Sequence, residues 1–261
     1  MTLKEYSENE FFVKEDIKAM KNKKEITKKE YILYFVIVLC VMALAIALLA
    51  VAAILQKIGV NNVVYTVIGL SSFPILIFGV VFAVLKLGKM QKYGLNQKVE
   101  KLEKTELICL DGASKTKIID YCERKKYNLI ENKYYHKRRF SLFNDYINYF
   151  IRCADKDGRV GECLKREIDL FDGENRNEKH KCLLIVLFSD QITKEDLSDL
   201  KELSLPIVAH ELYAKTVGVG YDSVVVALVD DNSGKLYAFN EHKHSSTMNS
   251  SGVNLLRRIL N

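Results

Sequence analysis

Two long stretches without a charged residue lie near the N-terminus of this 261-residue chain. Residues 31–56 and residues 63–85 contain no Asp, Glu, Lys, Arg or His. A helix rises about 1.5 Å per residue, so about 20 apolar residues are enough to cross the hydrocarbon layer of a bilayer. Neither stretch carries the polar stripe of a helix at the surface of a soluble domain. We therefore expect a two-helix transmembrane hairpin over residues 31–85.

A cleaved signal peptide is the alternative interpretation of the first stretch. Signal peptides have a short basic start and an apolar core of about 7–15 residues. Here residues 1–30 precede a longer core, and a second apolar stretch follows. Cleavage near the alanines at 50–53 is therefore the weaker interpretation.

Lysine is distributed very unevenly around the two stretches. Between them there is a single lysine, Lys57, and the turn residues Gly59, Asn61 and Asn62. Many lysines flank the hairpin on its other side: Lys14, Lys18, Lys21, Lys23, Lys24, Lys28, Lys29, Lys86, Lys89, Lys92, Lys98, Lys101 and Lys104. Because cytoplasmic flanks are enriched in Lys and Arg, both termini are expected inside the inner (plasma) membrane, with residues 57–62 on the far side.

Small residues within the two stretches predict that helices pack closely in the lipid bilayer, which is the expected partner of the hairpin. Small side chains let helix backbones approach, and proline kinks a helix or frees a carbonyl. The candidate packing residues are Ala43, Ala47, Gly69, Ser72, Pro74, Gly79 and Ala83. They fit a simple anchor, a homo-oligomer or a pore. Because neither stretch contains an ionisable residue, an anchor is favoured over a pore or transporter.

The segments that flank the hairpin have helical features. Thr27 and Glu30 have capping-box spacing, and residues 1–30 are expected to form a cytoplasmic amphipathic or flexible segment. Residues 86–110 are expected to form a helical stalk, because Leu95, Val99 and Leu102 recur at helical spacing. Such a stripe suits packing on a domain or a short dimer seam.

Residues 111–240 predict a cytoplasmic mixed α/β sandwich, of two or three layers. Strands are expected at 128–140, 146–154, 182–188, 207–213, 223–229 and 235–239, and helices near 114–122, 160–171 and 193–205. Pro206 is expected to end the last of these helices. Residues 241–261 are expected to form a mobile tail to 252 and then a short amphipathic helix.

No motif in the chain identifies a reaction. The sequence therefore predicts no catalytic residues, no metal ligands and no cofactors. The six cysteines form no CxxC pair, which suits reduced structural thiols. His210-Glu211 begins like the zinc-binding helix motif His-Glu-x-x-His. The second histidine is missing, because position 214 is Ala214. Ser189-Asp190, at the end of a buried strand, is interpreted as an ordinary loop, and Asp230 to Glu241 as a hairpin instead of a calcium loop.

A basic tract interleaved with aromatic residues is the most suggestive feature of the chain. Tyr127, Tyr134, Tyr135 and Phe140 lie among its cations. The cations are Arg124, Lys125, Lys126, Lys133, Lys137, Arg138 and Arg139. Such a patch suits anionic lipid headgroups or single-stranded nucleic acid, and a solvated hairpin face is the plainer interpretation.

The leading functional prediction is a membrane-anchored sensing or interaction module without catalysis. Its partner would be a cytoplasmic protein, a lipid headgroup or a small ligand. One alternative is a two-span pore-forming effector gated by its cytoplasmic domain. The other is an anchored nuclease or hydrolase that uses Glu167, Asp169, Asp172 and Glu174, although the usual carboxylate-x-lysine order is not met.

Overall fold

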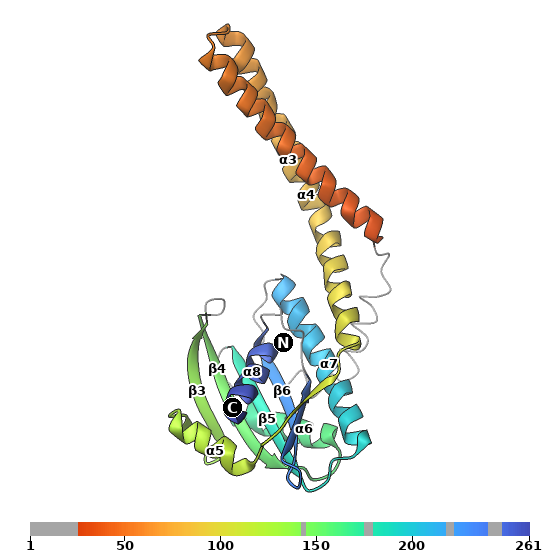
Figure 1. The fold of residues 1–261 in the computed structure, drawn as a ribbon, viewed down its shortest axis with the longest axis vertical. Helices are drawn as coiled ribbons and strands as arrows, with labels where there is room; N and C mark the ends of the chain where they lie inside the picture. Colours follow the sequence, from red (N-terminus) through yellow and green to blue (C-terminus); the bar gives the residue numbers. More distant parts are fainter. Residues whose placement is uncertain (1–25, 142–144, 175–179, 218–221, 240–246) are drawn as a thin grey trace. The chain divides into compact units, whose positions relative to one another are not determined.

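The structure is a computed structural model, and it describes residues 26–141, 145–174, 180–217, 222–239 and 247–261. It divides into two compact units (Figure 1). One unit contains residues 21–97 and the other contains residues 98–261. Each unit is described by itself.

The first unit is a helical hairpin. Helix α3 spans Lys28–Lys57, and helix α4 begins at Asn62 and runs to Glu103. The predicted capping box is confirmed: Thr27 Oγ1 accepts from the Glu30 amide at 3.2 Å, and Glu30 Oε2 accepts from the Thr27 amide at 2.7 Å. The turn between the helices uses Gly59, whose φ of +79° suits glycine.

Small residues let the two helices approach each other. A Cβ placed on Gly79 would lie 2.6 Å from Val41 Cγ1, and a Cβ on Gly69 would lie 3.6 Å from Ala52 Cβ. Ser72 is fully buried, and its hydroxyl donates to the Gly69 carbonyl at 2.6 Å. Gly69, Ser72 and Gly79 therefore lie where the two helices of the hairpin approach each other. Helix α4 stays helical through Pro74.

The outer surface of the hairpin is apolar. Both helices are long and apolar enough to span a membrane, by length and composition. Many of their large side chains are exposed among the described residues, as at Ile54 and Leu70, which are 60% and 59% exposed. Near one end, the Tyr34 and Phe82 rings meet edge to face at 5.9 Å, and the Lys86 ammonium lies 5.1 Å from the Tyr34 ring.

The second unit is built on a seven-stranded mixed sheet with the order β1-β7-β6-β5-β4-β3-β2. Strands β4, β5 and β6 are parallel, and the remaining pairs are antiparallel. The strands are β1 Leu107–Leu110, β2 Asn128–Ile130, β3 Tyr134–Ser141, β4 Asp145–Asp155, β5 Lys181–Ser189, β6 Ser223–Asp230 and β7 Lys235–Phe239. The helices are α5 Lys115–Arg124, α6 Val160–Glu174, α7 Lys194–Val217 and α8 Met248–Leu260.

Helices cover both faces of the sheet, which makes a three-layer sandwich (Figure 1). Helices α5 and α8 pack on one face and helices α6 and α7 on the other. Strand β5 lies in the middle, and its residues from Lys181 to Phe188 are all buried. The predicted mixed α/β fold is therefore confirmed, as are the β6–β7 hairpin and the buried strand 182–188.

Three expectations about individual segments are wrong. Helix α7 continues through Pro206 to Val217, so residues 207–213 are helical and not a strand. Residues 248–252 belong to α8, which starts well before the expected short helix. The stalk is helical only to Glu103, because Leu107–Leu110 forms the edge strand β1 beside β7.

Each error has a physical cause. In α7, Leu200, Ile207, Val208 and Leu212 are buried, and this apolar face outweighs the hydrogen bond that Pro206 cannot make. In α8, Thr247 caps the helix by accepting from the Ser250 amide at 3.1 Å. The remaining part of the expected mobile segment, residues 241–246, lies outside the described residues.

Candidate binding surface

Strand β3 carries the centre of the basic tract and divides it between two faces of the sheet. Successive strand residues point to opposite faces. Tyr135 packs with the α5 and α8 core, so Lys137 and Arg139 share that face. Tyr134 packs with the α6 and α7 core, so Arg138 and Phe140 share the other face. The tract is therefore not one continuous patch.

On the α5 face, Lys137 and Arg139 are held by aromatic side chains. The Arg139 guanidinium donates from Nη2 to the Tyr127 hydroxyl at 3.0 Å and lies 5.8 Å from the rings of both Tyr127 and Tyr149. The Lys137 ammonium lies 5.5 Å from the Tyr127 ring and donates to the Lys125 carbonyl. Such cation–π contacts hold the cations in fixed positions.

The phenols beneath these cations stay neutral into the alkaline range, because burial raises both of their pKa values. Burial raises the pKa of Tyr149 to about 12, and it raises the pKa of Tyr127 still further. The positive charge of Arg139 lowers both pKa values in part, but less than burial raises them. Both rings thus act as neutral hydrogen-bonding and packing groups, and the positive charge of Arg139 is not cancelled by a phenolate.

On the opposite face, Arg138 stacks on the neighbouring strand. Its guanidinium carbon lies 4.1 Å from the centroid of the Tyr146 ring, which comes from β4. Phe140 meets the same ring edge to face at 5.6 Å. Phe140 is 67% exposed and Tyr146 is 43% exposed, so this face joins a cation to an exposed apolar surface.

The other cations of the tract lie at the end of α5 and in the β2–β3 turn. Arg124, Lys125 and Lys126 are exposed at the helix end, where Lys126 adopts a φ of +56°. Lys133 lies in the turn, and its carbonyl accepts from Arg152 Nη1 at 3.4 Å. Lys133 is separated from Lys137 by Tyr134, Tyr135 and His136, the three residues of β3 that pair with β2.

Six of these seven cations have no carboxylate partner within the described residues. The six are Arg124, Lys125, Lys126, Lys137, Arg138 and Arg139. Two less exposed cations elsewhere differ: the half-buried Arg152 pairs with Glu167 at 2.8 Å, and the buried Lys181 lies 3.6 Å from Asp222. We call the six cations together with Tyr127, Phe140, Tyr146 and Tyr149 the basic β3 surface.

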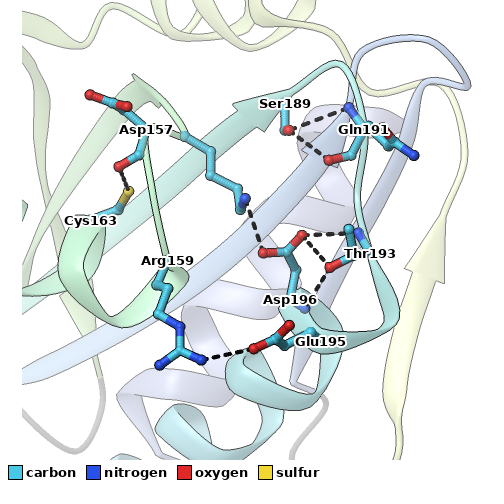
Figure 2. A network of polar contacts seen from close by, with 9 residues as sticks. Asp157, Arg159, Cys163, Ser189, Gln191, Thr193, Glu195 and Asp196 are labelled. Atoms are coloured by element: carbon cyan, nitrogen blue, oxygen red, sulfur yellow. Dashed lines mark hydrogen bonds and ion pairs between the residues drawn. The ribbon is translucent and has the colours of Figure 1, made fainter.

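The carboxyl ends of the parallel strands carry a second polar network (Figure 2). The Lys156 ammonium lies 3.0 Å from Asp196 Oδ1. Thr193 caps α7: its hydroxyl oxygen accepts from the Asp196 amide at 3.1 Å, and Asp196 Oδ2 accepts from the Thr193 amide and hydroxyl at 2.9 and 2.8 Å. Ser189 Oγ donates to the Gln191 carbonyl at 2.8 Å and accepts from its amide at 3.3 Å. These groups meet one another's hydrogen-bonding needs. The network therefore fixes the segments that follow β4 and β5, and Ser189 has a structural role.

Candidate catalytic groups are dispersed or already engaged. Glu167 is buried in α6 against Arg152, whereas Asp169 is exposed. Glu211 is fully buried in α7, where it accepts from the Ser223 hydroxyl and, at 3.1 Å, from the Asn249 amide. Asp230 accepts from Asn232 and Ser233 in the β6–β7 turn, as a hairpin requires. Within the described ranges, no three His, Cys, Asp or Glu side chains gather in a way that could hold a metal ion.

Some site residues escape sequence reasoning. Tyr146 and Tyr149 lie on β4, and their contacts with Arg138 and Arg139 follow from the β3–β4 register, which pairs Arg138 with Asn148. Only the aromatic content of residues 146–150 hinted at them. Glu241, the last residue of the rejected calcium-loop spacing, lies outside the described residues.

Comparisons of the chain with protein-family models, with curated proteins and with solved structures gave no match.

Proposed function

We propose that this protein is a membrane-anchored interaction module that binds an anionic partner through the basic β3 surface, without catalysis. The observation that carries the proposal is the set of six cations with no carboxylate partner within the described residues, four of which are exposed. Arg138, Arg139 and Lys137 lie on aromatic rings, which orders them before a partner arrives. Ordered cations lose less conformational entropy on binding.

The anchor is the α3–α4 hairpin, which crosses the inner (plasma) membrane with both termini in the cytoplasm. Its exposed apolar surface suits lipid, and the lysines that flank it follow the positive-inside rule. The domain of residues 98–261 is then held in the cytoplasm. Its cysteines are all unpaired within the structure, in keeping with a reducing compartment.

An anchor is favoured over a pore by the packing of the small residues. Gly79 lies against Val41 and Gly69 lies against Ala52, so the small-residue faces are occupied inside one hairpin. A pore would need such faces for contacts between copies. A nuclease is disfavoured because Glu167, the buried carboxylate of its expected cluster, is neutralised by Arg152.

The test uses the full-length protein in uncharged detergent micelles and fluorescein-labelled polyglutamate as an anionic probe. Replacing two exposed cations, Lys125→Glu with Arg138→Glu, is expected to weaken binding by about tenfold or more, since each lost charge contact contributes roughly 1 kcal/mol. The matched control, Lys165→Glu with Lys194→Glu, changes the net charge equally at exposed sites on α6 and α7. Equal losses in both double variants would mean that only net charge matters, and the proposed surface would then be wrong.

A further inference from the structure

Strand β3 has an outer edge that β2 covers only in part. On one side, β4 pairs with all of β3, from Tyr134 to Ser141. On the other side, β2 pairs only with Tyr134, Tyr135 and His136. Among the described residues, no strand pairs with the outer edge of residues 137–141. Figure 1 shows β3 near this border of the sheet.

The end of α5 explains why β2 is so short. The amides of Lys125, Lys126 and Tyr127 donate to carbonyls of the last turn of α5, at 2.9–3.0 Å. Lys126 takes the left-handed conformation that commonly ends a helix. Residues before Asn128 therefore belong to the helix end and do not extend β2 along β3.

An unpaired strand edge exposes main-chain donors and acceptors. In an antiparallel sheet, alternate residues direct their N–H and C=O groups to the same side, so alternate residues of 137–141 direct theirs away from β4. Such an edge can accept an extended peptide as an added strand, with main-chain hydrogen bonds for affinity and side-chain contacts for specificity. The short β2 leaves this edge open at the segment where the basic β3 surface lies.

Charge decides which strand can occupy the edge. Residues 137–139 are Lys-Arg-Arg, and no described carboxylate pairs with them. A second copy of β3 would bring like charges together, which is unfavourable directly across strands, and lysine on an edge strand is a common guard against such pairing. An acidic strand would instead meet cations on both of its faces, Lys137 and Arg139 on one and Arg138 on the other.

We propose that an extended acidic segment of a partner protein adds as a further strand beside Lys137–Ser141. This inference rests on the proposed function, because it names the partner class of the basic β3 surface. Side chains on one face of the added strand contact Arg138 and Phe140, which favours acidic residues with apolar neighbours. Those on the other face contact Lys137 and Arg139.

The experiment measures binding of two labelled synthetic peptides to the full-length protein in uncharged micelles. One peptide repeats Glu-Glu-Thr-Thr, so that an extended strand of it carries glutamate on both faces. The other has the same sequence with every backbone nitrogen methylated, so its charge is kept while its main-chain donors are lost. Strand addition predicts that the methylated peptide binds about tenfold more weakly or worse, because several main-chain hydrogen bonds are lost. It also predicts weaker binding of the unmethylated peptide to Lys125→Glu/Arg138→Glu, and no change with Lys165→Glu/Lys194→Glu.

Other outcomes would overturn the inference in distinguishable ways. Equal binding of both peptides would reject strand addition while leaving the basic surface and the proposed function intact. Arg138-dependent binding to phosphatidylglycerol vesicles, without binding to either peptide, would make the lipid surface the partner. A dimer whose formation excludes both peptides would show that a second copy occupies the edge. Failure of the peptides, the vesicles and polyglutamate alike would reject the proposed function as well.

Discussion

Arg139 on β3 and Tyr127, just after α5, are joined by a hydrogen bond of 3.0 Å from the guanidinium to the phenol hydroxyl. Tyr127 is 7% exposed, so this bond links the buried core beneath α5 to the solvent-facing cations. It is the most direct connection between the stability of the domain and the geometry of the basic β3 surface.

Removing that hydroxyl should lower stability modestly. We expect Tyr127→Phe to cost about 1–3 kcal/mol, because a charged donor loses its acceptor. For a domain of this size, each kcal/mol corresponds to roughly 2–4 °C in Tm. Thermal unfolding of the full-length protein in micelles checks this, with Tyr213→Phe as the control at an exposed ring. Equal Tm values for Tyr127→Phe and the unchanged protein would contradict the role given to the bond.

Alkaline pH should destabilise the domain through its buried tyrosine and cysteine side chains. Burial raises the pKa of Tyr149 to about 12 and that of Cys153 to about 12, against ordinary values of 10.0 and 9.0. Below about pH 9 both groups are protonated in the folded and unfolded states, so their contribution is complete. As pH rises from about 9 to 12 the unfolded chain loses protons first, and stability falls. Urea unfolding across this range should show the decline, and Tyr149→Phe should make it less steep above pH 10.

The close approach of α3 and α4 at Gly79 predicts a sharp steric limit. Gly79→Leu should force Val41 away and cost about 1–3 kcal/mol of hairpin packing, as overpacking does. Gly88→Leu is the matched control, because a Cβ at Gly88 meets nothing within 4 Å. The measurement is oxidative cross-linking of Tyr34→Cys to Phe82→Cys in a Cys40→Ser background, because these rings are 5.9 Å apart. Unchanged cross-linking in Gly79→Leu would show that the helices do not pack through this glycine.

The proposed topology predicts which cysteines a membrane-impermeant maleimide can reach. Cys109 is exposed in β1, so it should be labelled in inside-out vesicles and protected in intact cells. Ile58→Cys, in the exposed turn between the helices, should show the reverse pattern. Labelling of Cys109 in sealed, intact cells would place the domain on the other side of the membrane.

The α/β class and several elements could be predicted because their patterns are local. Residues 182–188 are apolar on both faces, which suits a central parallel strand. Thr27 and Ser114 precede helices at capping positions, and both caps are present, with Ser114 accepting from the Lys117 amide at 3.2 Å. Such features depend on a few neighbouring residues, so the sequence alone contains them.

Other features depend on contacts between distant residues and could not be predicted. Ile207 and Val208 favour strands by propensity, yet they pack at helical spacing because α7 covers the sheet. Leu107–Leu110 is a strand only because β7 lies beside it. The basic tract is contiguous in sequence, but strand alternation sends Arg138 and Arg139 to opposite faces, and the register with β4 selects the rings that hold them.

The pairing of β1 with β7 also sets when the domain can fold during synthesis. Leu107–Leu110 emerges from the ribosome before every other strand, whereas its partner, Leu236–Phe239, emerges after every other strand. Long-range pairings of this kind slow folding, since the entropy cost of closing a large loop comes before any stabilising contact forms. The apolar segment LICL therefore waits without a partner through most of translation, and nascent chains stalled before residue 236 should be the ones that chaperones hold.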